Sequence, residues 1–139
     1  MSGGASVLLA FDYGSRRIGV AVGETVTRSA RPLATVTVRG NRPDWGTVTR
    51  LIGDWCPSRL VVGLPVDMDG AEQEASRGAR RFGRQLEGRY RLPVDLIDER
   101  LTTRIARQQL AERGRGRDPV DPVAAQLILE GWFSERSAA

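Results

Sequence analysis

The chain contains no histidine and no lysine, and it has a single cysteine, Cys56. The lack of histidine excludes Ser-His-Asp triads, histidine general bases and histidine-ligated zinc sites. One cysteine excludes an intramolecular disulfide and favours a reducing compartment. No apolar run approaches the roughly 20 residues of a membrane span, and no signal-peptide pattern opens the chain. We therefore expect a cytoplasmic protein with no membrane partner.

All 21 basic residues are arginines, against 17 acidic residues, so the net charge is +4. Arginine is well suited to bidentate contact with phosphate, which makes a polyanionic partner plausible. A bias toward arginine codons explains the same composition equally well. The length of 139 residues, with 40% hydrophobic and 27% charged, predicts one soluble globular domain over residues 1–139.

Runs of apolar and β-branched residues predict five strands. They cover residues 7–12, 17–23, 33–38, 60–64 and 94–99. Apolar residues at helical spacing predict four helices. They cover residues 43–55, 72–88 and 102–113, followed by a last helix from Asp121. The order β-β-β-α-β-α-β-α-α predicts a three-layer α/β fold, in which a mixed five-stranded sheet has helices on both faces.

Three carboxylates lie at the ends of predicted elements. Asp12 ends the first strand, Glu99 ends the last strand, and Asp121 begins the final helix. Aspartate is uncommon in strands, and a buried carboxylate is costly unless it is paired or binds a metal. Ligands that are all oxygen suit Mg²⁺ or Mn²⁺, and two such ions can activate a water and stabilise the leaving oxygen of a phosphodiester. Together the acids favour a two-metal nuclease site, with Asp12 as the bridging ligand.

Each acid also has a purely structural interpretation. Turn amides could satisfy Asp12, and a surface ion pair could explain Glu99. Asp121 stands before Pro122, so it is a favourable helix N-cap with proline at the first helical position. Taken singly, Asp121 is better explained as a cap than as a metal ligand.

Four motifs in the chain resemble those of the YqgF/RuvX family. They are FDYGSRRIGVAV at 11–22, VGLPVDMDG at 62–70, DERLTT at 98–103 and DPVAAQLILE at 121–130. The motifs follow the family's order and span nearly the whole chain. The resemblance implies an RNase H-like fold akin to RuvC resolvases. It also implies a nuclease that processes the 5′ end of pre-16S ribosomal RNA, with Holliday-junction resolution as the older proposal.

By the same resemblance, Asp12, Glu99 and Asp121 are the catalytic, metal-binding acids. Pro122 is a mild departure, because the family more often has a small residue there. Proline fits the first turn of a helix, so the departure leaves the expected site intact.

Eight arginines are candidate nucleic-acid contacts. They are Arg16, Arg17, Arg77, Arg81, Arg84, Arg100, Arg104 and Arg115. The first two follow the turn after Asp12, and three others share one face of the helix predicted over 72–88 with Arg80. Ion pairs or a solvated helix face are the alternative explanation.

The preferred hypothesis is a metal-dependent nuclease acting on precursor ribosomal RNA, free or within a pre-ribosomal particle. A resolvase of four-way DNA is the second, and it would favour a symmetric homodimer, whereas a processing nuclease can act as a monomer. A non-catalytic ribosome-assembly factor that binds nucleic acid is the third. The turn after Asp12 also resembles the phosphate loop of sugar kinases and actin-like ATPases, but those need two such domains and this chain is long enough for one.

Overall fold

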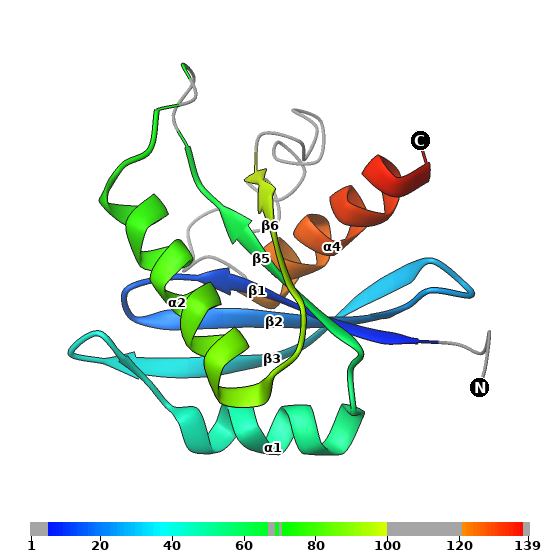
Figure 1. Cartoon of the computed structure of the whole chain (residues 1–139), viewed down its shortest axis with the longest axis horizontal. Coiled ribbons are helices and arrows are strands. Elements are labelled where there is room, and N and C mark those ends of the chain that lie inside the picture. Colours follow the sequence, from blue (N-terminus) through cyan, green and yellow to red (C-terminus); the bar gives the residue numbers. More distant parts are fainter. Residues whose placement is uncertain (1–5, 67–68, 70, 100–120, 138–139) are drawn as a thin grey trace.

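Six strands form the sheet at the centre of the protein, in the order β4-β3-β2-β1-β5-β6 (Figure 1). The computed structural model describes residues 6–66, 69, 71–99 and 121–137. The strands are β1 (Val7–Tyr13), β2 (Arg17–Glu24), β3 (Ser29–Arg39), β4 (Arg42–Pro43), β5 (Arg59–Leu64) and β6 (Val94–Asp98). The helices are α1 (Trp45–Trp55), α2 (Glu74–Tyr90) and α4 (Asp121–Ser137). None of these three helices has both the length and the apolar character that crossing a membrane requires.

The sheet is mixed, as predicted. β1 pairs antiparallel with β2, which in turn pairs antiparallel with β3. On its other side β1 pairs parallel with β5, and β5 pairs parallel with β6. Because parallel strands run in one direction, the carboxyl ends of β1, β5 and β6 lie at the same edge of the sheet.

The prediction of five strands was wrong by one, because β4 is an additional two-residue strand. Gly40 and Asn41 both have positive φ, at 56° and 65°, as a tight type I′ hairpin turn requires. The turn folds β4 back so that it pairs antiparallel with the end of β3. Pro43 is tolerated there because β4 is an edge strand.

The boundaries of α1 differ from the predicted ones for the same reason. The helix begins at Trp45 and not at residue 43, since residue 43 belongs to β4. Asp44 caps it: Asp44 Oδ1 accepts a hydrogen bond from the Thr47 amide at 3.3 Å, and Oδ2 accepts one from the Thr47 hydroxyl at 2.8 Å. These hydrogen bonds lower the pKa of the Asp44 carboxyl.

Three other elements are close to their predicted positions. β3 starts four residues before the predicted strand at 33–38, because Ser29 to Arg31 also pair with β2. β6 ends at Asp98, so Glu99 is the residue directly after the strand. α4 begins at Asp121, as predicted. The predicted helix over 102–113 lies outside the described residues.

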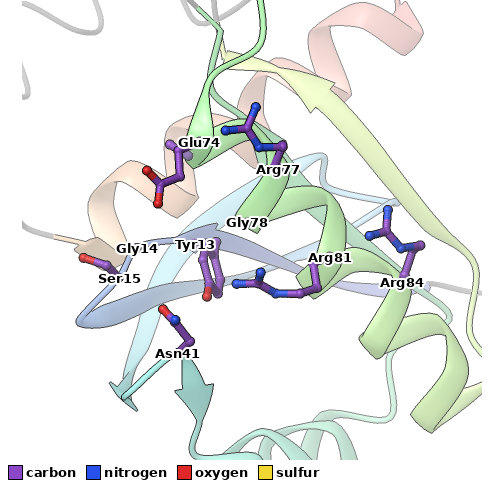
Figure 2. A pocket seen from close by; sticks show the side chains of 10 residues that line it. Tyr13, Gly14, Ser15, Asn41, Glu74, Arg77, Gly78, Arg81 and Arg84 are labelled. Carbon is purple, nitrogen blue, oxygen red and sulfur yellow. The ribbon is translucent and has the colours of Figure 1, made fainter.

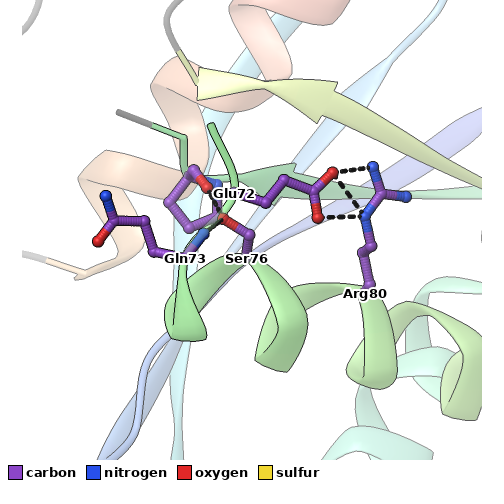
Figure 3. A network of polar contacts seen from close by, with 5 residues as sticks. Glu72, Gln73, Ser76 and Arg80 are labelled. Carbon is purple, nitrogen blue, oxygen red and sulfur yellow. Dashed lines mark hydrogen bonds and ion pairs between the residues drawn. The ribbon is translucent and has the colours of Figure 1, made fainter. Parts of the chain in front are cut away.

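α2 begins at Glu74, two residues later than predicted, at a polar junction with the end of β5. Ser76 is fully buried, accepts a hydrogen bond from the Gln73 amide at 2.9 Å and donates one to the Pro65 carbonyl (Figure 3). This junction sets where the first turn of α2 lies relative to the sheet.

The alternation of side chains along β1 divides the core into two layers. Leu9 and Phe11 pack with residues of α1 and α2, including Phe82. Leu8 and Ala10 pack instead with residues of α4. Helices therefore cover both faces of the sheet, which confirms the predicted three-layer α/β architecture.

One carboxylate ties α4 to the sheet. Asp95 in β6 accepts hydrogen bonds from Arg59 Nη1 at 2.9 Å, Trp132 Nε1 at 2.8 Å and Arg136 Nη2 at 2.9 Å. The guanidinium of Arg136 also lies over the Trp132 ring, 4.5 Å from its centroid. The C-terminal half of α4 is thereby held against the start of β6.

Asp95→Asn should destabilise the protein by about 1–3 kcal/mol, because a charged acceptor shared by three donors is replaced with a neutral amide. Urea unfolding measures the free energy of unfolding. Asp54→Asn, on the exposed surface of α1, is the matched control and should leave stability unchanged. Equal stability of the two variants would contradict this role for Asp95.

Candidate functional site at the carboxyl edge of the sheet

Asp12 and Glu99 lie at the same edge and face the same side of the sheet. The parallel register pairs Phe11 with Val62, so Asp12 lies beside Gly63 of β5. Gly63 in turn pairs with Ile97 of β6, two residues before Glu99. Since side chains alternate along a strand, both acids are on the side covered by α4. Each is half-buried.

Gly63 makes room for the Glu99 carboxylate. A Cβ atom on Gly63 would lie 2.8 Å from Glu99 Oε2 and 2.4 Å from Ile128 Cδ1. The carboxylate therefore lies over β5, the strand next to the one that carries Asp12. A side chain at position 63 would displace either the acid or α4.

The third predicted acid, Asp121, is the first residue of α4; its side chain lies outside the described part of the structure. Ile128 contacts Gly63, and Trp132, one turn later, reaches Asp95 near the start of β6. The helix therefore runs away from the carboxyl edge toward its C-terminus. Asp121 precedes Ile128 by seven residues, about 10 Å along the helix axis, so α4 begins toward the edge that carries the other two acids.

The donor set suits a hard divalent cation. Asp12 and Glu99 offer only oxygen ligands, as Mg²⁺ and Mn²⁺ prefer, and the missing side chain at Gly63 leaves the space in which one of them lies. Among the side chains described, which do not include that of Asp121, no group of three acidic or thiol residues is close enough to hold a metal ion. The residues present thus fit a metal, with two of the three predicted ligands described.

A groove with a cavity volume of about 790 Å³ opens on the opposite face of β1, beside α2 (Figure 2). Tyr13 lies in it, because the alternation that turns Asp12 toward α4 turns Tyr13 toward α2. The centroid of its ring lies 5.2 Å from the centroid of the Phe82 ring. The groove, here called the α2 groove, is lined by Tyr13, Gly14, Ser15, Asn41, Glu74, Ala75, Arg77, Gly78, Arg81 and Arg84.

The arginine face of α2 divides into two parts. Arg80 pairs with Glu72, with Nε 2.8 Å from Oε1 (Figure 3), and it is not among the residues that line the groove. These hydrogen bonds lower the pKa of the Glu72 carboxyl and raise the pKa of the Arg80 guanidinium. The structure brings the other three, Arg77, Arg81 and Arg84, together along one wall of the α2 groove.

The remaining predicted nucleic-acid contacts are distributed differently. Arg16 is exposed in the turn between β1 and β2, and Arg17 begins β2 and is half-buried. Neither is among the residues that line the α2 groove. Arg100, Arg104 and Arg115 lie outside the described residues.

Sequence analysis missed Tyr13, Asn41 and Glu74 as lining residues of the groove. The position of Tyr13 could have been predicted from the sequence, because consecutive side chains of a strand point to opposite faces of the sheet and Tyr13 directly follows Asp12. Asn41 reaches the groove from the β3–β4 turn (Figure 2), which the sequence analysis did not predict. Glu74 is the first residue of α2, and its place at the groove depends on where that helix begins.

Comparisons with known proteins identify similar chains over nearly the whole length. The sequence profile of RuvX, described as Holliday junction resolvase, matches residues 6–135. A relative from Saccharophagus degradans, named as a candidate pre-16S rRNA nuclease, is 45% identical, with 94% of this chain and 95% of the relative covered. A relative of the same name from Azotobacter vinelandii is 49% identical, with 97% and 98% covered.

A solved structure shares the fold. Thermus thermophilus RuvC in complex with Holliday junction substrate is similar with a TM-score of 0.63, at 17% identity, over 96% of this chain and 97% of that chain. At this identity the likeness concerns the fold alone, and it confirms the predicted RNase H-like architecture.

Gly63→Ala should destabilise the protein by about 1–3 kcal/mol, because the added methyl group overlaps the Glu99 carboxylate and Ile128. Gly53→Ala in α1 is the control, since a Cβ there would meet nothing within 4 Å, and alanine favours a helix over glycine. Urea unfolding of both variants compares the two. A Gly63→Ala protein as stable as Gly53→Ala would contradict the close approach.

Proposed function

The chain belongs to the RuvX family, and from this membership we propose that it is a nuclease that hydrolyses phosphodiester bonds in the precursor of 16S ribosomal RNA, in the cytoplasm. Relatives at 45% and 49% identity, matched over almost their full lengths, carry the name of this activity. A pre-ribosomal particle is a suitable partner, because it presents the same RNA to a basic protein.

The observation that carries the proposal is the placement of two carboxylates. Asp12 and the Glu99 side chain lie on adjacent parts of one sheet edge, on the α4 side, with Gly63 leaving the space for Glu99. Two half-buried carboxylates thus lie at one edge of the sheet, and carboxylate oxygens are ligands that a divalent cation can share. Metal binding explains both acids, whereas separate structural roles would have to explain each one alone.

We assign Asp12, Glu99 and Asp121 the role of holding one or two Mg²⁺ or Mn²⁺ ions. Such ions, when bound, lower the pKa of water and stabilise negative charge on the leaving oxygen of a phosphodiester. When ionised, the three acids are negatively charged oxygen ligands with no proton to donate, so they would hold the ions in place, and the ions would screen the acids' charge from the substrate phosphates. The chain has no histidine to act as a general base.

Positive charge near the acids supports a nucleic-acid substrate. Arg16 is exposed in the β1–β2 turn that follows Asp12, a position from which it can bind a substrate phosphate. The arginines of the α2 groove extend the positive surface on the other side of the same hairpin. Arginine binds phosphate oxygens in a bidentate manner, which adds geometric specificity to charge.

A four-way DNA junction is the second candidate substrate. The family description and the RuvC complex that shares this fold both favour it. A junction has two-fold symmetry, so its resolution calls for a homodimer, whereas RNA processing needs only one active site. Sedimentation of the protein with each substrate separates these two possibilities.

Asp12→Asn should lower the rate of cleavage of a precursor 16S RNA fragment about a thousandfold, because a neutral amide is a poor ligand and metal-assisted stabilisation is worth several kcal/mol. Chelation with EDTA should abolish the activity of the wild-type protein, and added Mg²⁺ or Mn²⁺ should restore it. Asp54→Asn serves as the control and should cleave at the wild-type rate. An Asp12→Asn protein that cleaves at that rate would falsify the assignment.

The same assay with a four-way DNA junction decides between the two substrates. Faster cleavage of the precursor RNA supports the processing nuclease. Symmetric cleavage of the junction with no cleavage of the RNA would replace it with the resolvase.

A further inference from the structure

The α2 groove and the two acids lie on opposite faces of β1 and meet at the hairpin between β1 and β2. Asp12 faces α4, Tyr13 faces α2, and Gly14 and Ser15 of the connecting turn line the groove. We propose, resting on the nuclease function above, that the α2 groove binds a single-stranded segment that flanks the cleaved segment of the substrate. The strand passes around the tip of the β1–β2 hairpin to reach the acids.

The charge of the groove suits a phosphate backbone. Three arginines and one glutamate, Glu74, are its charged lining residues. Within the described part of the chain, Arg81 and Arg84 form no ion pair, in contrast to Arg80, which Glu72 neutralises on the same helix. Arg77 also contributes to the lowered pKa of Glu72 through its charge. Arg81 and Arg84 therefore carry positive charge that no carboxylate of the described residues pairs with.

The spacing of the arginines matches a short stretch of backbone. They occupy positions i, i+4 and i+7 of α2, so they follow one face of the helix over about 10 Å. A stacked strand advances about 3.4 Å per nucleotide along its axis, so this wall spans about three nucleotides. A bound segment of this length would place one phosphate near each arginine.

Neutral polar groups face the arginines across the groove. In Figure 2 the Arg81 side chain points toward Tyr13, and the Asn41 side chain points into the groove from below. Tyr13 is packed on one side against Phe82, and in Figure 2 its hydroxyl oxygen lies near the end of the Arg81 side chain. Tyrosine, serine and asparagine can both donate and accept hydrogen bonds, as sugar hydroxyls and base edges require.

The geometry favours a single strand over a duplex. Asp12 and Tyr13 are consecutive residues whose side chains lie on opposite faces of one strand, so a substrate that contacts both must turn sharply within a few nucleotides. Duplex DNA has a persistence length of about 150 base pairs and resists such a turn. A single strand turns with little cost, which makes it the expected occupant.

Fluorescence anisotropy with a labelled single-stranded RNA of about twelve nucleotides, measured without divalent ions, tests the binding. The triple variant Arg77→Gln, Arg81→Gln, Arg84→Gln should bind at least tenfold more weakly than wild type. A plot of the logarithm of the association constant against the logarithm of the salt concentration should be less steep for the triple variant. The slope should fall by about two in magnitude, because each of the three lost phosphate contacts accounts for roughly 0.7. Arg80→Gln is the matched control, on the same helix with the same change of charge, and should stay within twofold of wild type.

Circular dichroism establishes that the variants are folded, and Arg81→Gln alone provides a milder test if the triple variant is not. Wild-type affinity for the RNA in both the triple variant and Arg81→Gln would overturn the inference. A loss of affinity in Arg80→Gln as large as that in the triple variant would overturn it too. A blunt RNA duplex is the second ligand. If the triple variant loses as much affinity for the duplex as for the single strand, the choice of a single strand is overturned.

Cleavage assays separate this inference from the nuclease proposal. The triple variant should raise KM by a larger factor on a substrate with a single-stranded flank than on one without it. If Asp12→Asn is inactive but the triple variant has a wild-type KM on the flanked substrate, the groove inference fails and the nuclease stands. If Asp12→Asn retains full activity, the nuclease assignment fails, whatever the binding data show.

Discussion

The alternation of side chains along β1 is the constraint on which the rest of the structure depends. β1 is paired on both sides, to β2 and to β5, so its side chains can point only to the two faces of the sheet. One set of residues builds the core with α1 and α2, and the other builds the core with α4. A shift of register by one residue would exchange the two sets and bury the Asp12 carboxylate against the wrong helices.

The same constraint separates the two parts of the candidate site. The Asp12 side chain points to the face of the sheet that α4 covers, where it lies with Glu99 at the edge formed by the ends of the parallel strands. The Tyr13 side chain points to the opposite face, where it lines the α2 groove together with the arginines of α2. Chemistry and substrate binding are thus assigned to opposite faces of one strand, within two consecutive residues.

Close packing holds the acidic side of the site together. Gly63 lets the Glu99 carboxylate and Ile128 approach β5, and Asp95 holds the far end of α4 through Trp132 and Arg136. The helix that begins with Asp121 is therefore held against the sheet in its middle by the packing of Ile128 on Gly63. Its C-terminal half is held by the hydrogen bonds to Asp95. Rigid support of this kind is what a metal site needs, because ligands must keep their geometry when the ion and substrate bind.

The sequence by itself determined the class of fold, most of its elements and the pair of acids at one edge, because strand and helix periodicity and a carboxylate after an apolar run are local patterns. It did not reveal β4, since a two-residue strand forms only where the Gly40–Asn41 turn brings it against β3. Only the tertiary structure decided which arginines of α2 are neutralised. Arg80 meets Glu72, a partner eight positions away that lies before the helix, and helical spacing cannot predict such a contact. Likewise, Gly63 resembles any strand glycine in the sequence, and its role exists only because β6 and α4 bring Glu99 and Ile128 onto it.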